Sequence, residues 1–255
     1  IGPGVRLPDF LGVGTQKGGT TYLHGLLQQH PQVFLAHPKE LHYFTKKFQC
    51  GVDWYGQQFS MAFPNQCCGE ITPYYMYHPL VPQRIASVIP KVRLVVLLRD
   101  PVQRAISQYF HSCRLGFEPL DFEEALASET ARLDDVQAVM HRGEDHFSHQ
   151  QHSYVSRSCY DEQLPRWFDL FSADQLLVLR SEDLFVAPQI IWDRVLEFLQ
   201  LDDYPLPSSV QTYVGGGEAK TISAEICASL YQRLMPTYQW IEKNYGMSWR
   251  EFSDY

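Results

Sequence analysis

One glycine-rich segment contains the residue types that bind an anion. It lies between an apolar run at residues 10–13 and an amphipathic run at residues 21–29, and it reads Gly14, Thr15, Gln16, Lys17, Gly18, Gly19, Thr20, Thr21. Glycines let the backbone turn tightly and bring its N–H groups close to an anion, and a helix N-terminus adds further donors. Lys17 supplies a positive charge, and the two threonines supply hydroxyl donors. The segment predicts a phosphate-binding loop.

This loop differs from a Walker A motif. That motif has a glycine, four further residues and then Gly-Lys-Ser/Thr, so its lysine follows the last glycine. Here Lys17 precedes Gly18 and Gly19. The alternative interpretation is an ordinary turn between a strand and a helix, but such a turn requires neither the lysine nor both threonines.

A second anion site is predicted after the most apolar segment, residues 92–98. Arg99, Asp100 and Pro101 follow it. An arginine at the carboxyl end of a strand lies where open α/β sheets bind ligands. Asp100 and Pro101 suit the N-cap and the first position of a helix. Ser107 would lie roughly two turns into that helix, so Arg99 and Ser107 could contact one phosphate; alternatively, Arg99 pairs with a carboxylate such as Asp100.

The elements that position these residues alternate along the chain. Strand-like apolar runs occur at residues 10–13, 92–98 and 176–179, and helical patterns at residues 21–29, 101–115, 188–199 and 223–244. This alternation predicts an α/β fold with a mostly parallel sheet, built as a single domain over residues 1–255. Residues 130–152 are polar and predict a mobile insertion or a lid. Residues 201–221 predict a long loop.

Composition excludes several classes of protein. The 255 residues include 21 Lys and Arg against 29 Asp and Glu, a net charge of −8 that disfavours nucleic acid as a partner. No apolar stretch approaches the roughly 18 residues of a membrane span. The six cysteines form no C-x-x-C pair, which favours reduced thiols in a cytoplasmic protein. The first residues lack a Met and a signal sequence, so we expect a segment excised from a larger multidomain protein.

The two anion motifs together resemble the sulfotransferase family that uses 3′-phosphoadenosine 5′-phosphosulfate (PAPS). Residues 17–21 resemble its 5′-phosphosulfate loop, and residues 95–107 resemble its 3′-phosphate motif. The segments similar to the heparan-sulfate-type and related bacterial branch are residues 38–44, 53–55 and 70–74. The resemblance covers residues 8–200 and weakens afterwards. It implies a P-loop-like three-layer sandwich, with helices on both faces of the sheet.

A finer resemblance concerns the acceptor. The acidic charge and residues 114–120 resemble the sulfotransferase domains of cyanobacterial polyketide synthases, of the curacin or olefin synthase type. That resemblance implies sulfation of the β-hydroxyl of a polyketide or fatty acyl chain on an acyl carrier protein, before decarboxylative alkene formation. A free small alcohol, a lipid or a glycan is the alternative acceptor.

The resemblance also implies roles for individual residues. Lys17 would stabilise charge on the bridging oxygen as the product 3′-phosphoadenosine 5′-phosphate (PAP) leaves. Glu40 matches the family's Lys-Glu-x-His pattern and would be the general base, and His42 would hydrogen-bond the acceptor or share the base role; without the family, Glu40 is better explained as a surface carboxylate paired with Lys39. The implied cofactor-binding residues are Gln16, Lys17, Gly18, Gly19, Thr20, Thr21, Arg99, Ser107 and, from the late loop, Lys220. The scheme requires no metal.

Two other readings remain open from the residues alone. A phosphotransferase would need Mg²⁺ and an acidic ligand after a strand, but Asp100 is better explained as a helix cap. A nucleotide-binding or docking module without turnover would bind PAP and transfer nothing. Some aromatic residues are candidates for an acceptor tunnel or for the core: Trp54, Tyr55, Tyr74, Tyr75 and Tyr77.

Overall fold

The computed structural model describes residues 5–208, 210 and 218–250. Contacts divide the chain into two compact units, each built from two separate segments. The first unit comprises Ile1–Leu98 and Arg166–Tyr213, and the second comprises Arg99–Pro165 and Val214–Tyr255. The single domain over residues 1–255 therefore stays a prediction.

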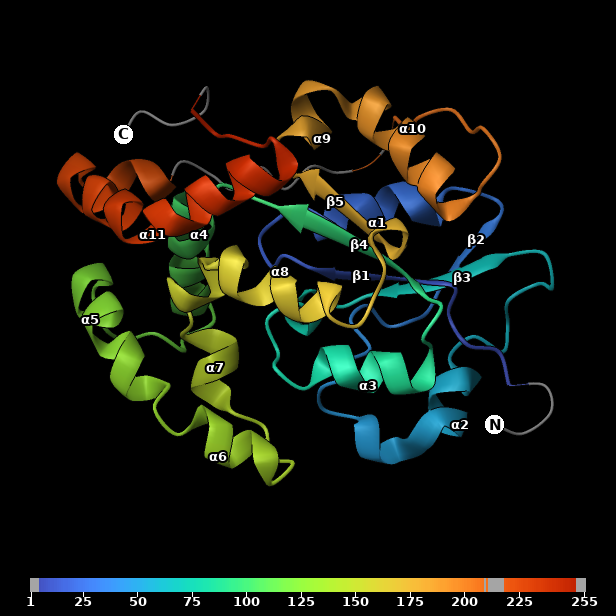
Figure 1. Ribbon diagram of the computed structural model, residues 1–255, viewed down its shortest axis with the longest axis horizontal. Coiled ribbons are helices and arrows are strands. Elements are labelled where there is room, and N and C mark those ends of the chain that lie inside the picture. Colours follow the sequence, from blue (N-terminus) through green and yellow to red (C-terminus); the bar gives the residue numbers. More distant parts are fainter. Residues whose placement is uncertain (1–4, 209, 211–217, 251–255) are drawn as a thin grey trace. The chain divides into compact units, whose positions relative to one another are not determined.

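The first unit contains a five-stranded sheet (Figure 1). Its strands are β1 (Phe10–Gly14), β2 (Val33–Leu35), β3 (Cys67–Ile71), β4 (Arg93–Leu98) and β5 (Leu176–Arg180), in the order β2-β3-β1-β4-β5. Every neighbouring pair is parallel. The carboxyl ends of the strands therefore lie at one edge, and the phosphate-binding loop leaves β1 at that edge.

Helices cover both faces of this sheet (Figure 1), which confirms the predicted fold class. On one face lie α1 (Thr20–Gln28) and α10 (Pro188–Leu199), preceded by the short α9 (Asp183–Val186); on the other lie α2 (Gly51–Gln57) and α3 (Val81–Val88). The side chains that α1 and α10 bury against the strands are Leu23, Leu26, Leu27, Ile191, Trp192, Val195, Leu196 and Leu199. Their three- and four-residue spacing is that of an amphipathic helix on a core.

Helices make up the second unit. They are α4 (Pro101–Arg114), α5 (Phe122–Arg132), α6 (Val136–His141), α7 (Phe147–Gln151) and α11 (Ala224–Tyr245), with the short 3₁₀ turns η3 (Ser156–Ser158) and η5 (Glu218–Thr221). The unit boundary falls inside α8 (Tyr160–Phe168). The hydrophobic core of the second unit joins α4, α5 and α11 through Val102, Ala105, Phe122, Ala125, Leu230 and Leu234.

Local signals in the sequence set several helix ends. Asp100 caps α4 as predicted, and Gly116, with a left-handed φ of 73°, follows its C-terminus. The helix predicted at residues 188–199 is α10 without any shift. Ser223 is the N-cap of α11, since its side chain accepts from the Ile226 N–H. None of the described helices is both long and apolar enough to span a bilayer.

The polar segment at residues 130–152 is not uniformly exposed. It includes α6 and α7, and it buries Met140, His149 and His152. His152 contacts the Phe117 carbonyl at 2.9 Å, and His146 contacts the Asp135 carboxylate at 2.8 Å. The role of residues 130–152 as a lid stays a prediction. In the long loop predicted at residues 201–221, Gly215, Gly216 and Gly217 lie outside the described residues.

Candidate active site

The loop predicted to bind phosphate occupies residues 15–19, between β1 and α1. Gly19 is the N-cap of α1 and has a left-handed φ of 86°, which favours glycine. A β-carbon on Gly18 would lie 2.8 Å from the carbonyl oxygens of both Leu97 and Thr15, so no side chain fits there. Both glycines are therefore required, one by space and the other by conformation.

Neighbouring strands hold this loop in place. The Thr15 N–H donates to the Leu97 carbonyl of β4 at 2.9 Å, and the Ser181 hydroxyl donates to the Gly18 carbonyl at 2.7 Å. Helix geometry leaves the first N–H groups of α1 without intrahelical acceptors. With the half-buried Lys17 beside them, these donors form the kind of site that binds a phosphate group.

Lys39 connects the loop to the predicted general base. Its Nζ donates to Thr21 Oγ1 at 3.3 Å and lies 3.7 Å from Glu40 Oε1. Burial lowers the pKa of Lys39, and the neighbouring Glu40 carboxylate opposes that shift. The pairing of Lys39 with Glu40, considered above only as an alternative, is thus present, and it brings Glu40 toward the loop.

Glu40 and His42 form a contact pair. His42 Nε2 lies 3.2 Å from Glu40 Oε2, and His42 Nδ1 lies 3.2 Å from Thr45 Oγ1. With its hydrogen on Nε2, the imidazole donates to the carboxylate, and the Thr45 hydroxyl lies 3.2 Å from both Nδ1 and the His42 carbonyl oxygen, to which it donates. In extended backbone, side chains two residues apart lie on one side, but His42 has a φ of 56°. A left-handed turn, not a strand, brings them together.

Lys17 and His42 have a left-handed backbone conformation, which is uncommon for residues other than glycine. Among described residues other than glycine, positive φ occurs at Lys17 (67°), His42 (56°) and Gln200 (57°). Gln200 is the C-cap of α10, where this conformation is common. Left-handed backbone costs about 1 to 2 kcal/mol per residue and clusters at functional sites. Two residues predicted to be catalytic therefore carry this backbone strain.

The residues predicted to bind the 3′-phosphate lie in the second unit. Arg99 is half-buried, and its carbonyl accepts from the Tyr160 hydroxyl at 2.7 Å. Asp100 accepts from the N–H groups of Val102 and Gln103 and from the Tyr238 hydroxyl at 2.6 Å. These bonds confirm the helix cap and disfavour Asp100 as a magnesium ligand.

Helix α4 is the element that the remaining candidates share. Ser107 is half-buried on it, and both η3 and η5 pack against it, so exposed Lys220 lies on an element beside α4. Arg104 of α4 is fully buried and donates to Ser158 Oγ and to the Tyr154 carbonyl, each at 2.6 Å. Sequence reasoning missed Arg104, and the role of Lys220 stays a prediction.

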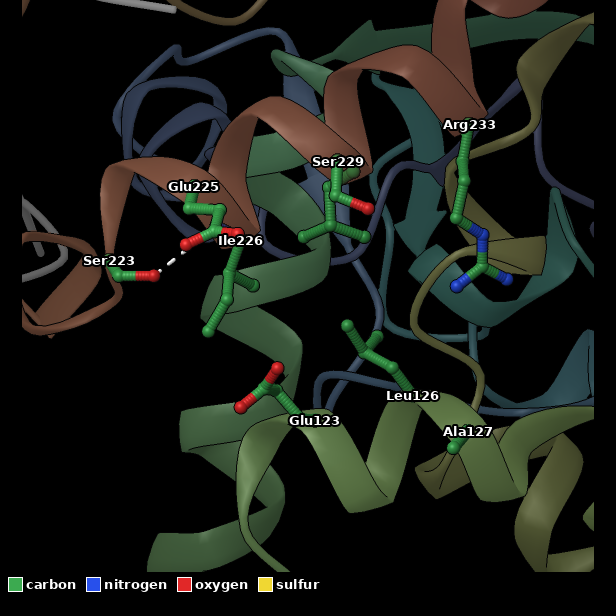
Figure 2. A pocket seen from close by; sticks show the side chains of 9 residues that line it. Glu123, Leu126, Ala127, Ser223, Glu225, Ile226, Ser229 and Arg233 are labelled. Atoms are coloured by element: carbon green, nitrogen blue, oxygen red, sulfur yellow. Dashed lines mark hydrogen bonds between the residues drawn. The ribbon is translucent and has the colours of Figure 1, made fainter.

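The second unit contains a pocket that other residues line (Figure 2). Its volume is about 460 Å³, and it opens between α5 and α11. The residues that line it are Glu123, Leu126, Ala127, Ser223, Glu225, Ile226, Ser229, Leu230 and Arg233. Two glutamates, one arginine and an apolar floor do not fit a nucleotide that carries two phosphate groups. No predicted cofactor residue lines it.

Most of the candidate aromatic residues belong to the core. Tyr55 and Tyr75 are fully buried, and Tyr74 and Tyr77 nearly so. Trp54 is half-buried under Lys47, whose Nζ lies 5.2 Å from the indole centroid. Within the part of the chain that the structure describes, no three His, Cys, Asp or Glu side chains gather to hold a metal ion.

His24 lies on α1, one turn after Thr21, and is 8% exposed. Burial, reinforced by the positive charge of Lys39, lowers its pKa from 6.5 to about 4. As the pH falls through that window, the unfolded chain takes up the proton first, so stability decreases. The Nε2 atom of His24 has no hydrogen-bond partner among the described residues.

We therefore expect His24→Leu to be less sensitive to acid than the wild type. Between pH 6.5 and about 4 the wild type should lose about 3 kcal/mol more of its unfolding free energy than the variant. Urea unfolding at several pH values in this window measures the difference. Exposed His141, replaced by leucine, is the control. Equal pH dependence of wild type and His24→Leu would contradict the expectation.

Comparison with known proteins places these features in a family. The family described as "Sulfotransferase domain" matches residues 7–215. The chain belongs to this family. The membrane-associated sulfotransferase kil1 of Dictyostelium discoideum is 27% identical over 77% of this chain and 56% of its own length. Heparan sulfate glucosamine 3-O-sulfotransferase 3B1 of Homo sapiens is 30% identical over 77% of this chain and 47% of its own length.

A solved structure supports the fold of this sulfotransferase domain. The sulfotransferase from Alicyclobacillus acidocaldarius superposes with a TM-score of 0.77 at 24% identity, covering 94% of this chain and 96% of that one. The chain spans about half the length of the two relatives named above. The family predicted from the motifs is thus confirmed.

Proposed function

We propose that this chain is a PAPS-dependent O-sulfotransferase that moves a sulfuryl group to an acceptor hydroxyl. The observation that carries the proposal is one continuous series of contacts, Thr21–Lys39–Glu40–His42. It joins a phosphate-binding loop to a carboxylate–imidazole pair. Transfer from a phosphosulfate to an alcohol needs both kinds of group close together.

The loop fits the 5′-phosphosulfate end of PAPS. Gly18 leaves room for no side chain, and the backbone N–H groups, Lys17 and two hydroxyls supply the donors. When bound, PAPS supplies an activated sulfuryl group, whose bond to the phosphate breaks during transfer. For the 3′-phosphate, the family motif assigns Arg99 and Ser107.

Four side chains share the work of the proposed reaction. Lys17 is suited to stabilise negative charge on the leaving phosphate oxygen. The Glu40 carboxylate takes the proton of the acceptor hydroxyl as its oxygen bonds to sulfur. His42 donates to Glu40 and so orients the carboxylate. Lys39, between Glu40 and Thr21, keeps the base next to the loop.

For the acceptor we propose the β-hydroxyl of an acyl chain on an acyl carrier protein. We propose that the transfer takes place in the cytoplasm. The support is the similarity of residues 114–120 to polyketide synthase sulfotransferase domains, together with the net charge of −8. An acidic surface repels a heparan-like polyanion. The second candidate is a glycan, because one relative at 30% identity is named as a heparan sulfate sulfotransferase.

Thermal stabilisation by PAP tests the cofactor. A ligand present at a hundred times its dissociation constant adds about 2.7 kcal/mol of stability, so PAP without metal should raise the Tm by several degrees. ATP and GTP with Mg²⁺ are the controls. Stabilisation only by those nucleotides would remove the sulfotransferase proposal and favour a phosphotransferase.

Mass spectrometry then distinguishes the acceptors. The protein is given PAPS with a 3-hydroxyacyl carrier protein, with the matching free 3-hydroxy acid, or with a heparan oligosaccharide. We expect the carrier-bound chain to gain one sulfo group fastest. Faster transfer to the oligosaccharide would favour the glycan, and PAP binding without transfer to any acceptor would indicate a module without turnover.

A further inference from the structure

The turn that carries His42 is held from outside by hydroxyl groups. The His42 N–H donates to Thr72 Oγ1 at 3.4 Å, and the Phe44 N–H donates to the Tyr75 hydroxyl at 3.3 Å. Both acceptors follow β3 directly in the chain, Thr72 at its end and Tyr75 in the short 3₁₀ turn η2 (Pro73–Tyr75). The end of β3 therefore fixes two backbone groups of the turn.

Further contacts complete the hold on this turn. The Tyr43 ring stacks on the Tyr55 ring, with centroids 4.0 Å apart and planes 7° apart. Arg84 donates to the carbonyl oxygens of Phe44 and Thr45 at 2.7 and 3.1 Å. Every residue from His42 to Thr45 is thus bonded or stacked against another segment.

Three of these anchoring residues converge on one carboxylate, Glu70 of β3. Its Oε1 accepts from the hydroxyls of Tyr55 at 3.0 Å and Tyr75 at 2.7 Å, and its Oε2 accepts from Thr72 Oγ1 at 2.7 Å. Glu70 is 2% exposed. Its neighbour Ile71 packs in the core on the opposite face of the sheet. Glu70 is therefore a hub buried under the turn.

A carboxylate in this place is unfavourable for stability alone. Desolvation raises the pKa of Glu70, and the three hydroxyl donors and the nearby His42 oppose that shift. Replacing the carboxylate and its hydroxyl donors together by apolar groups of similar volume would remove this penalty. His42, in contrast, needs outside support, because its left-handed backbone persists only where the surroundings over-determine it.

We propose that Glu70 is a positioning residue that, through Thr72 and Tyr75, holds the His42 turn and so places His42 against Glu40. The inference rests on the proposed sulfotransferase function. Glu70 itself touches neither the loop nor Glu40 in any described contact. Its effect on turnover must therefore pass through His42.

The variant Glu70→Gln tests this role. Glutamine keeps the size, but its NH₂ group cannot accept a hydrogen bond, so one hydroxyl anchor is lost. We expect kcat, measured as PAP release from PAPS, to fall by about a hundredfold, as for a small misplacement of reacting groups. Water serves as the acceptor if no alcohol has been found. The dissociation constant of PAP should stay within about twofold, because the loop lies on β1 and α1.

Two matched variants separate positioning from general stability. Tyr55→Phe removes a hydroxyl from Glu70 but no backbone bond of the turn, so kcat should change by less than about threefold. Glu118→Gln weakens the hydrogen bonds of another buried carboxylate. In the second unit, the Glu118 carboxylate accepts from Arg132 at 2.5 Å and from Tyr154 at 2.6 Å. This variant should lower the Tm without lowering kcat at temperatures where the protein stays folded. If Glu70→Gln does not fold, Thr72→Val carries the test.

A second readout needs no turnover. Hydrogen exchange of the His42 and Phe44 amides, measured without ligand, should quicken in Glu70→Gln and in Thr72→Val. In a His42→Asn background, Glu70→Gln should reduce kcat by less than about threefold, since residues that act as one unit are not additive. An unchanged kcat with slow exchange would overturn the inference, as would a full hundredfold loss in that background. A wild type that binds no PAP and transfers nothing would instead refute the proposed function.

Discussion

Replacing Lys17 with alanine should reduce kcat for sulfuryl transfer by about a thousandfold, as removal of a single preorganised charge-stabilising group does elsewhere. Charge on the leaving oxygen develops only as the bond to sulfur breaks, so the KM for PAPS should rise much less than kcat falls. Alanine keeps a β-carbon at the left-handed backbone position, φ 67°. The variant therefore changes the charge and not the conformational strain.

Steady-state kinetics of PAP release, with the dissociation constant of PAP from calorimetry, measures this effect. Lys46→Ala is the matched control, because Lys46 is an exposed lysine of the same unit and no predicted site residue. A large rise in KM with unchanged kcat would show that Lys17 binds ground state and transition state equally. That result would remove it from the catalytic role.

The second large effect concerns Glu40. Glu40→Gln keeps the shape of the side chain and a hydrogen-bonding end for His42 and Lys39, but it takes up no proton at neutral pH. General-base catalysis contributes about a hundred- to ten-thousandfold, so transfer should fall to near background. Binding of PAP should stay within about twofold, because the described contact between Glu40 and the loop runs through Lys39 rather than directly.

Single-turnover transfer and its pH dependence provide the check. In the wild type, the rate should fall at acid pH as the base becomes protonated, and this limb should be absent from any residual activity of Glu40→Gln. Glu197→Gln, at an exposed glutamate on α10, is the control. Retained turnover in Glu40→Gln would leave Glu40 as only an ion-pair partner of Lys39.

The parts of the fold with strong local signals could be predicted from the sequence. The buried run of β4, the Asp100 cap and Gly116 define one strand and one helix within a residue or two. Glycines between β1 and α1 define the loop in the same way. In each case the chemistry that determines the structure lies within a few residues of chain.

Strands β2 and β3 could not be predicted in this way. β2 has only three residues, and β3 contains Gly69 and Glu70, which interrupt an apolar pattern. A glutamate in a sequence normally indicates a position exposed to solvent. Glu70 is buried because three hydroxyl groups reach it, two from the turn that follows β3 and one from Tyr55 of α2, and the pattern of residue types does not show that these side chains point at one carboxylate.

The same distinction, between local sequence signals and contacts of distant segments, applies to the candidate site. Lys17 was identified from the glycine-rich loop itself and Glu40 and His42 through a family motif, and the structure adds the connection of Glu40 and His42 to the loop through Lys39 and Thr21. The left-handed turn at His42 left no decisive sequence signal, since a positive φ is uncommon for residues other than glycine, even though histidine is enriched among the exceptions. Arg104 was missed because a basic residue on an amphipathic helix is normally a surface residue.

The interleaving of the two units has a consequence for synthesis on the ribosome. Residues 1–98 supply β1 to β4, but β5 and α10 belong to the segment that begins at Arg166. Until that segment emerges, the β4 edge has no partner, and the apolar face that α10 covers with Trp192 is open. Unpaired edges and open apolar faces are the features that drive aggregation. Slow translation across residues 99–165 would prolong that exposure, so yield on expression should depend on chaperones more than on the stability of the finished protein.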